Sequence, residues 1–258
     1  MLKNTVKQKL LEGKTVLGTF QCMDSRAASA VLADSGFDWI IVDMEHGMMD
    51  LETAGDMAET ARSYGAVPFI RVSGNDDGII KRALDAGPLG VMIPMVNTKA
   101  DAQKAVSACK YSPQGVRGIG PGRASLFGLH LAEYTAQANQ EIMVLLQAEH
   151  KDAVDAIDEI LSVAGIDVIF VGPLDLSCSM GLIGQPNHPA VEAAVAKVLE
   201  AAQRHGVVPG IFCMDAREAL RRAEQGFRFI AVGLDSKFLA ASAAQALESV
   251  RSGLGPKQ

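Results

Sequence analysis

Short apolar runs alternate with longer stretches of helical periodicity along the whole chain. The apolar runs predict buried strands at Val16–Phe20, Trp39–Asp43, Val67–Arg71, Gly90–Pro94, Ile142–Gln147, Val168–Val171, Val208–Phe212 and Phe229–Val232. The stretches between them predict helices near Ser25–Ser35, Leu51–Tyr64, Asp76–Ala86, Thr98–Tyr111, Lys151–Leu161, Ala190–His205, Asp215–Gln225 and Ser236–Arg251. Eight strands alternating with eight helices are typical of a (β/α)8 TIM barrel, whereas a doubly wound open sheet, the rival, requires no such count.

The residues at the segment boundaries agree with this alternation. Four glycines follow helical stretches and precede apolar runs, as expected for the residue after a helix: Gly36, Gly65, Gly206 and Gly226. Four polar residues occupy the position of helix N-caps: Asp50, Asn75, Thr98 and Asp215.

Two segments depart from the repeating pattern. A further helix near Thr5–Glu12 is expected to cover the bottom of the barrel. The stretch Ser112–Gln140 is predicted to be an irregular insertion after the fourth strand, and long barrel loops of this kind usually serve function. We find no internal repeat or linker, so residues 1–258 are expected to form a single barrel domain.

Composition and charge exclude several classes of protein. The chain has 258 residues, 48% of them hydrophobic, and a formal net charge of −6. Its acidic balance, with a pI near 5.4, argues against nucleic-acid binding, which needs a basic surface. No apolar run approaches membrane length, the start has no signal-peptide pattern, and no cysteines form a C-x-x-C pair. We therefore expect a cytoplasmic protein that binds neither membrane nor nucleic acid.

Polar side chains that suit catalysis occur where the predicted strands end. Glu149 and Asp175 follow two consecutive strands, and the carboxyl ends of adjacent parallel strands meet on one face of a barrel. Two carboxylates there could share a hard divalent cation that keeps open positions for a substrate. His46 and Arg71 follow or end two other strands, and Gln147 ends the strand that Glu149 follows, so a base, a guanidinium and an amide are expected on the same face.

Each of these residues also has an ordinary explanation. Asp175 suits a helix N-cap or a turn, and Glu149 suits the first turn of a helix, where an acid complements the helix dipole. His46 beside two acids is compatible with a surface ion pair. Arg71 is harder to explain in this way, because a guanidinium on an apolar strand needs an anionic partner.

Several motifs resemble those of the metal-dependent (class II) pyruvate aldolases, which include 4-hydroxy-2-oxoheptanedioate aldolase and 2-dehydro-3-deoxy-sugar-acid aldolases. The resemblance covers nearly the whole chain, and its most specific part is the block Gly172-Pro173-Leu174-Asp175-Leu176-Ser177. Similar motifs are Gln147-Ala148-Glu149, Asp43-Met44-Glu45-His46-Gly47, Pro68-Phe69-Ile70-Arg71, Ile93-Pro94-Met95 and Gly115-Val116-Arg117-Gly118.

The resemblance implies roles for the matching residues. Glu149 and Asp175 would bind a divalent metal, taken to be Mg²⁺, Mn²⁺ or Co²⁺. Gln147 and the backbone of Gly172, Pro173 and Leu174 beside Asp175 would hold the carboxylate and oxo group of the 2-oxo acid.

The same resemblance implies an acid/base and an oligomer. His46 would be the acid/base, Asp85 would raise its basicity, and Arg71 would steady the developing oxyanion. The family forms homo-trimers or homo-hexamers in which the last helix, here Ser236–Arg251, is exchanged between subunits.

Two stretches differ from the family pattern. Gly47-Met48-Met49-Asp50 follows the histidine, and Gly120-Pro121-Gly122-Arg123-Ala124-Ser125 is also unlike the family's usual sequence. Both are expected where the aldehyde half of the substrate would lie. The roles of Arg117, Arg123 and Ser125 remain open, since the two arginines suit either a substrate carboxylate or a neighbouring subunit.

Elementary chemistry favours the metal route without the resemblance. Breaking a carbon–carbon bond beside a carbonyl leaves an enolate, which is stabilised either by a lysine Schiff base or by a metal ion. Every lysine lies outside the predicted strands, whereas a Schiff-base lysine normally projects from a strand into the barrel mouth. Together with the resemblance, this preference predicts a class II aldolase that cleaves a 4-hydroxy-2-oxo acid to pyruvate and an aldehyde.

Two alternatives accompany this prediction. The first is another metal-enolate lyase on the same barrel, such as a citryl-type lyase or an oxaloacetate decarboxylase, which needs no aldehyde pocket. The second is a barrel that binds a 2-oxo acid without turnover. Such a protein would lack the base or a metal ligand, and His46, Glu149 and Asp175 are all present.

Overall fold

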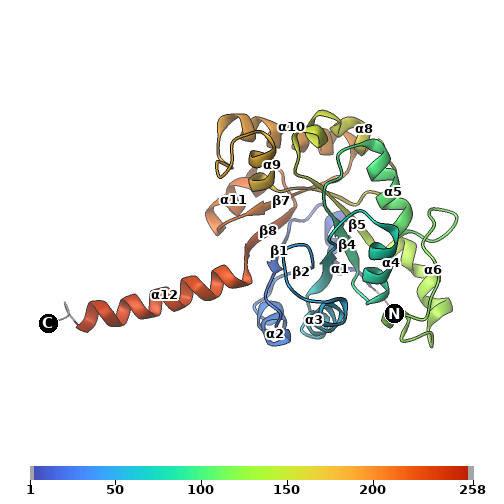
Figure 1. Ribbon diagram of the computed structural model, residues 1–258, viewed down its shortest axis with the longest axis horizontal. Coiled ribbons are helices and arrows are strands. Elements are labelled where there is room, and N and C mark those ends of the chain that lie inside the picture. The colour runs from blue at the N-terminus through green and yellow to red at the C-terminus, as the bar shows by residue number, and fades with distance from the viewer. Residues whose placement is uncertain (1–2, 255–258) are drawn as a thin grey trace.

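A closed barrel of eight parallel strands forms the body of the protein in a computed structural model that describes residues 3–254 (Figure 1). Each strand pairs with the next along the chain, and β8 returns to β1. The strands are β1 Val16–Gln21, β2 Trp39–Asp43, β3 Val67–Arg71, β4 Gly90–Ile93, β5 Met143–Ala148, β6 Val168–Val171, β7 Val208–Cys213 and β8 Phe229–Leu234. The predicted (β/α)8 barrel is confirmed.

Helices surround the barrel. They are α1 Thr5–Leu11, α2 Arg26–Asp34, α3 Leu51–Ser63, α4 Asp77–Asp85, α5 Lys99–Cys109, the 3-10 turn η1 Arg123–Ser125, α6 Leu131–Glu141, α7 Lys151–Asp155, α8 Ile157–Leu161, α9 Pro173–Ser179, α10 Pro189–His205, α11 Ala216–Gln225 and α12 Asp235–Leu254. The prediction that Ser112–Gln140 is irregular was wrong for its second half, which forms η1 and most of α6. The helix α9 was also unexpected, and the predicted N-cap Asn75 is replaced by Asp76, whose side chain accepts from two amides of α4.

The barrel interior is filled from its N-terminal end by aromatic side chains. Trp39 stacks on Phe229 with ring centroids 4.0 Å apart. A Cβ at Gly18 would lie 1.9 Å from the Trp39 ring, so only glycine fits beneath this indole. Val6 and Leu10 of α1 pack against the same interior cluster, as expected for a helix that covers the barrel bottom. This packing leaves the opposite end, where the strands finish, for polar side chains.

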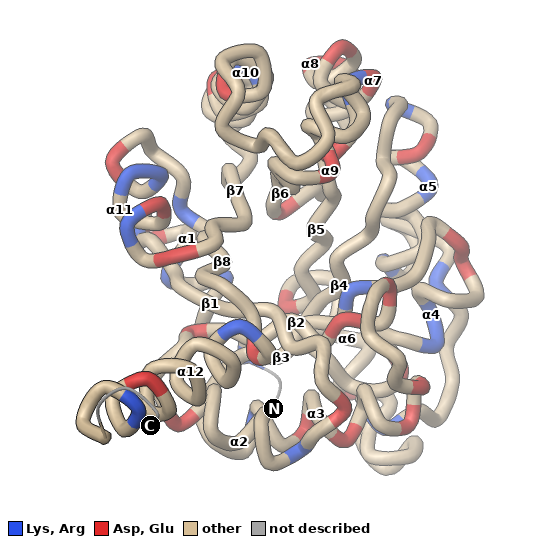
Figure 2. Tube along the Cα trace, turned by 60° about the vertical axis from the view of Figure 1, so that its left-hand side comes forward, with Lys and Arg blue, Asp and Glu red and all other residues tan. Residues whose placement is uncertain are grey.

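Charged residues are nearly absent from the strands. In Figure 2 the Lys, Arg, Asp and Glu residues lie mostly on the helices that surround the strands. Within the strands only Asp43 and Arg71 are charged, and each is the last residue of its strand. Parallel strands buried on both faces read as continuous apolar runs, so these two exceptions at the strand ends are candidates for a functional role.

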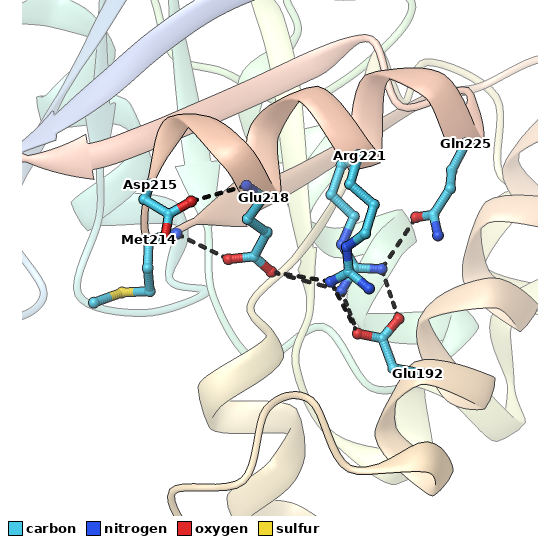
Figure 3. Close-up of polar contacts among 7 residues, drawn as sticks. Glu192, Met214, Asp215, Glu218, Arg221 and Gln225 are labelled. Carbon is cyan, nitrogen blue, oxygen red and sulfur yellow. Dashed lines mark hydrogen bonds and ion pairs between the residues drawn. The ribbon is translucent and has the colours of Figure 1, made fainter.

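A polar network joins α10 and α11 (Figure 3). Arg222 of α11 is 1% exposed and donates from both terminal nitrogens to Glu192 of α10, each over 2.8 Å. The exposed Arg221 approaches the same carboxylate at 3.2 Å. This network fixes α11, and with it the loop that follows β7, against α10.

The last helix, α12, runs away from the barrel (Figure 1). Among its described residues only Asp235 is buried. Several large apolar side chains on it are half exposed or more: Leu239, Leu247, Val250 and Leu254. Across residues 3–254, no helix has the length and apolar character needed to cross a membrane.

Candidate active site

An ion-pair cluster lies at the ends of β2 and β3. Asp43 and Arg71 are register partners in the β2–β3 ladder. The guanidinium donates from Nε to Asp43 Oδ1 over 2.8 Å and from Nη2 to Oδ2 over 2.6 Å, and its Nη1 lies 3.0 Å from Glu45 Oε2. Arg71 therefore has the anionic partners that its buried position requires.

Burial and ion pairing shift the pKa values of the two carboxyl groups in this cluster in opposite directions. Burial raises the pKa of Asp43, but the hydrogen bonds and charge of Arg71 outweigh it, so the pKa lies below its ordinary value. For Glu45 burial prevails over the attraction of Arg71, and the pKa is raised. Asp43 therefore ionises more readily than an ordinary aspartate, whereas Glu45 ionises less readily than an ordinary glutamate.

Glu149 follows β5 and is 4% exposed. Its Oε1 accepts a hydrogen bond from the Met95 amide over 2.8 Å, and its Oε2 accepts one from Gln147 Nε2 over 2.6 Å. Burial, opposed by the Met95 hydrogen bond and reinforced by the negative charges of Glu45 and Asp175, raises the pKa of Glu149 to about 7. The carboxylate lacks a nearby positive charge sufficient to offset its burial.

Asp175 lies in the first turn of α9, on its exposed side. A Cβ built on Gly172 would be 3.4 Å from Asp175 Oδ2 and 3.5 Å from Glu149 Oε2. The two carboxylates therefore converge over Gly172, where the absence of a side chain leaves room between them. The structure brings together the two acids that the sequence singled out.

This arrangement fits a divalent cation that keeps open positions. Two carboxylate oxygens face one small space, and the nearby Gln147 Oε1 is buried without a hydrogen-bond partner among the described residues. No group of three or more His, Cys, Asp or Glu side chains suited to a metal occurs within residues 3–254. The protein would therefore supply two carboxylates, and oxygens from water or substrate would complete the coordination.

His46 lies just beyond β2, in a turn organised by Asp43. The backbone amides of Glu45 and His46 donate to Asp43 Oδ1 over 3.0 Å and 3.3 Å. The His46 side chain itself is exposed at the barrel mouth. One buried carboxylate thus positions both the turn that carries His46 and the guanidinium of Arg71. Asp43 was given no role from the sequence, although the need of Arg71 for an acid on the neighbouring strand pointed to it.

The family model of HpcH/HpaI aldolase/citrate lyase matches residues 17–242, almost the whole barrel. The chain belongs to this family. The resemblance to the family's aldolases is thereby confirmed, and with it the lyase class.

Individual members of the family are similar to this chain over nearly their full length. A 4-hydroxy-2-oxo-heptane-1,7-dioate aldolase of Shigella flexneri is 37% identical over 244 residues, which is 94% of this chain and 91% of the relative. A hydroxypyruvate/pyruvate aldolase of Roseobacter denitrificans is 37% identical over 238 residues, covering 92% and 93% of the two chains. The crystal structure of a family protein from Burkholderia cenocepacia superposes with a TM-score of 0.93 at 36% identity, covering 96% of this chain and all of that one.

The pairing of His46 with Asp85, expected from the family resemblance, is not formed within one chain. Asp85 is the last residue of α4, and its Oδ1 accepts a hydrogen bond from Arg117 Nη2 over 2.8 Å. The Arg117 side chain is fully buried, with its guanidinium over the rings of Tyr111 and Tyr134. Among the described contacts Asp85 meets no atom of His46. Within one subunit, Arg117 therefore binds Asp85 and packs against the rings of Tyr111 and Tyr134.

Within one subunit, the glycine-rich stretch Gly120–Ser125 lies beside α3 and the end of α4 rather than beside Glu149, and its expected place next to the aldehyde stays a prediction. Arg123 pairs with Asp56 of α3 at 2.7 Å. Ser125 lines a cavity of ≈ 810 Å³ that also touches the first residues of β3, at the N-terminal end of the barrel. The active sites of barrel enzymes lie at the other end, so we assign no catalytic role to this cavity.

No strand of the described chain carries a lysine. Lys110 is the buried exception elsewhere, and burial lowers its pKa. Its ammonium donates to the carbonyl oxygens of Asn139 and Ile142, and Ile142 directly precedes β5 at the N-terminal end of the barrel. A lysine held there cannot reach a carbonyl bound beside Glu149. The geometry disfavours a Schiff base.

Proposed function

We propose that this chain is a class II aldolase that reversibly cleaves a 4-hydroxy-2-oxo acid to pyruvate and an aldehyde with the help of a divalent metal ion. The observation that carries the proposal is the convergence of Glu149 and Asp175 over Gly172. The relatives named as 4-hydroxy-2-oxo-heptane-1,7-dioate aldolase and hydroxypyruvate/pyruvate aldolase support the pyruvate half of the reaction.

Glu149 and Asp175 would hold the metal ion, for which we propose Mg²⁺, Mn²⁺ or Co²⁺. A bound divalent cation supplies a Lewis acid for the negative charge that develops on the oxo oxygen. Gln147, whose Oε1 lacks a partner among the described residues, would orient the 2-oxo acid from β5. The backbone of Gly172 and Pro173, continuing to Leu174, would face the carboxylate from the first turn of α9.

Arg71 would stabilise the oxyanion as cleavage proceeds. Its guanidinium is held in one orientation by Asp43 and Glu45, so it needs little reorganisation when charge appears on the substrate. Burial alone would lower the pKa of Arg71, but the carboxylates of Asp43, Glu45 and Glu149 outweigh this effect and raise the pKa. The guanidinium therefore stays charged at any working pH.

His46 would accept the proton of the 4-hydroxyl group. As this proton leaves, the hydroxyl carbon becomes the aldehyde carbonyl, and the electrons of the broken carbon–carbon bond pass to the oxo oxygen as an enolate. Transfer of the proton from His46 to the enolate carbon would then give pyruvate and return the base to its starting form. Histidine suits this step because its ordinary pKa lies near neutral pH and its side chain lies at the open mouth.

The direct test is the activity and metal binding of Glu149→Gln and Asp175→Asn. We expect both variants to fold, to lose metal-dependent cleavage of hydroxy-oxo acids, and to bind Mn²⁺ more weakly in calorimetry. Full activity in either variant, or undiminished wild-type activity in a chelator, contradicts the metal assignment. Faster turnover of oxaloacetate than of any hydroxy-oxo acid points instead to a decarboxylase on the same residues.

We also propose that the chain works as a homo-trimer or homo-hexamer in which α12 packs on a second copy. The support is the exposure of Leu239, Leu247 and Val250 on a helix that leaves its own barrel (Figure 1). Light scattering of the full chain and of a chain ending at Asp235 tests this. If the truncated chain forms oligomers with the same number of subunits as the full chain, the proposal is contradicted.

A further inference from the structure

Met95 has a backbone conformation that methionine rarely adopts. Its φ is +53°, in the left-handed region that strongly favours glycine. Holding such a residue there is unfavourable, and strain of this kind is kept where the surrounding structure requires it. The side chain does not supply the reason, because it is 51% exposed.

The neighbours of Met95 explain the turn. Pro94 has no amide hydrogen, so it ends the hydrogen-bond ladder of β4 and leaves the Met95 amide free of the sheet. That amide donates to Glu149 Oε1 over 2.8 Å. The next residue, Val96, is fully buried in the core between the strands and the helices. A left-handed residue lets the chain present its amide to Glu149 and return at once to the core.

The hydrogen bond fixes which oxygen of Glu149 faces Asp175. Oε1 is held by Met95, whereas Oε2 is the oxygen near the Gly172 position, 3.5 Å from a Cβ built there. Asp175 Oδ2 lies 3.4 Å from the same point. Were the Met95 amide turned away, the carboxylate would keep only the hydrogen bond from Gln147 to Oε2 and would lose the contact that holds Oε1.

We infer that Met95 is a positioning residue for the metal site: its left-handed backbone anchors Glu149 Oε1 so that Oε2 is presented toward Asp175. The inference rests on the proposed function, since it takes these two acids to be the metal ligands. Its basis is the backbone conformation rather than the thioether. Residues that tolerate a positive φ should therefore replace methionine without loss.

The test compares Mn²⁺ affinity, by calorimetry on the metal-free full-length protein, for Met95→Gly and Met95→Val. Glycine adopts the left-handed region freely, whereas a β-branched residue resists it strongly. We expect Met95→Gly to bind within about threefold of wild type and Met95→Val to bind about 10- to 100-fold more weakly, as for other residues that orient metal ligands. If Met95→Val fails to fold, Met95→Thr takes its place: it is also β-branched at Cβ but smaller and more polar, and it should bind more weakly than Met95→Gly.

Leu126→Val is the matched control. Leu126 also has a positive φ, +50°, but it ends η1 and has no contact with Glu149 among the described residues. This variant should lose stability without changing the Mn²⁺ affinity. Equal affinities for wild type and Met95→Val, or equal losses for the glycine and valine variants, overturn the inference. If Glu149→Ala itself binds Mn²⁺ as tightly as wild type, the proposed metal site fails instead.

Discussion

Asp43 and Arg71 face each other across β2 and β3 and are joined by two hydrogen bonds of 2.8 Å and 2.6 Å. Both side chains are buried, and Asp43 also accepts from the amides of Glu45 and His46. One carboxylate thus links the proposed oxyanion stabiliser to the turn that carries the proposed base. We therefore expect Asp43 to influence activity without touching the substrate.

Replacing Asp43 should therefore damage both folding and turnover. We expect Asp43→Asn to lower the free energy of unfolding by about 3 kcal/mol, because it leaves the buried Arg71 charge poorly paired. Activity should fall by about 100-fold through misplacement of the guanidinium, as when an oxyanion donor is lost. Urea denaturation and steady-state kinetics check the two effects. Asp56→Asn, which breaks exposed pairs with Arg26 and Arg123, is the control and should cost less than about 1 kcal/mol. Comparable losses in the two variants count against a special role for Asp43.

The stability of the metal-free protein should fall as pH rises from about 4.5 toward 7. The pKa of Glu149 is raised from 4.5 to about 7, so in this window the unfolded chain is ionised there while the folded chain keeps its proton. The folded state then binds more protons than the unfolded one, and the free energy of unfolding decreases with pH by on the order of 2–3 kcal/mol before levelling off.

Denaturation of wild type and Glu149→Gln across this pH range measures the effect. The variant should show a flatter profile, because its side chain does not titrate. It should also fold, since Met95 still finds an acceptor oxygen and the partnerless Gln147 Oε1 can accept from the new amide after a flip. The expectation is wrong if the free energy of unfolding of wild type rises from pH 5 to 7 in parallel with that of the variant.

Adding one methyl group at Gly172 should weaken metal binding without harming the fold. The new Cβ would lie in ordinary contact with Asp175 Oδ2 and Glu149 Oε2, at 3.4 Å and 3.5 Å, and would fill the space between them. The φ of −100° is open to alanine, so Gly172→Ala should be at least as stable as wild type. We expect its Mn²⁺ affinity, by calorimetry, to drop at least about tenfold. Gly74→Ala, which meets no atom within 4 Å, should leave the affinity unchanged.

The two neighbouring arginines of α11 should differ in their contribution to stability (Figure 3). Arg222 is 1% exposed and makes two 2.8 Å hydrogen bonds to Glu192, whereas Arg221 is largely exposed. We expect Arg222→Met to lower the free energy of unfolding by about 2 kcal/mol and Arg221→Met by less than about 1 kcal/mol. Thermal denaturation of the two variants measures these losses of stability. Equal losses would mean that burial adds nothing to the strength of the ion pair.

The sequence predicted the strands closely because a strand buried on both faces is a nearly unbroken apolar run. It missed α9, since Gly172-Pro173 reads as a turn, although proline is also favoured in the first turn of a helix. It missed α6, because only Tyr134 and Ala138 of that helix are buried and the periodicity is weak.

The candidate site was predictable only in part. The strand-end rule located Glu149 and Asp175, and the structure places their oxygens over Gly172. The conformation of Met95 could not be predicted, because methionine carries no signal for a positive φ. The partner of Asp85 was also beyond reach, since its pairing with Arg117 depends on the path of a long loop.

We propose above all that Glu149 and Asp175 jointly hold the ion that stabilises the enolate. A crystal structure of the full chain with Mn²⁺ and pyruvate, with the metal located by its anomalous scattering, tests it most directly. We predict one manganese peak above Gly172, within coordination distance of one oxygen from each carboxylate and of pyruvate. A peak bound by neither acid, or pyruvate bound without any metal beside it in crystals that still turn over, would contradict the account.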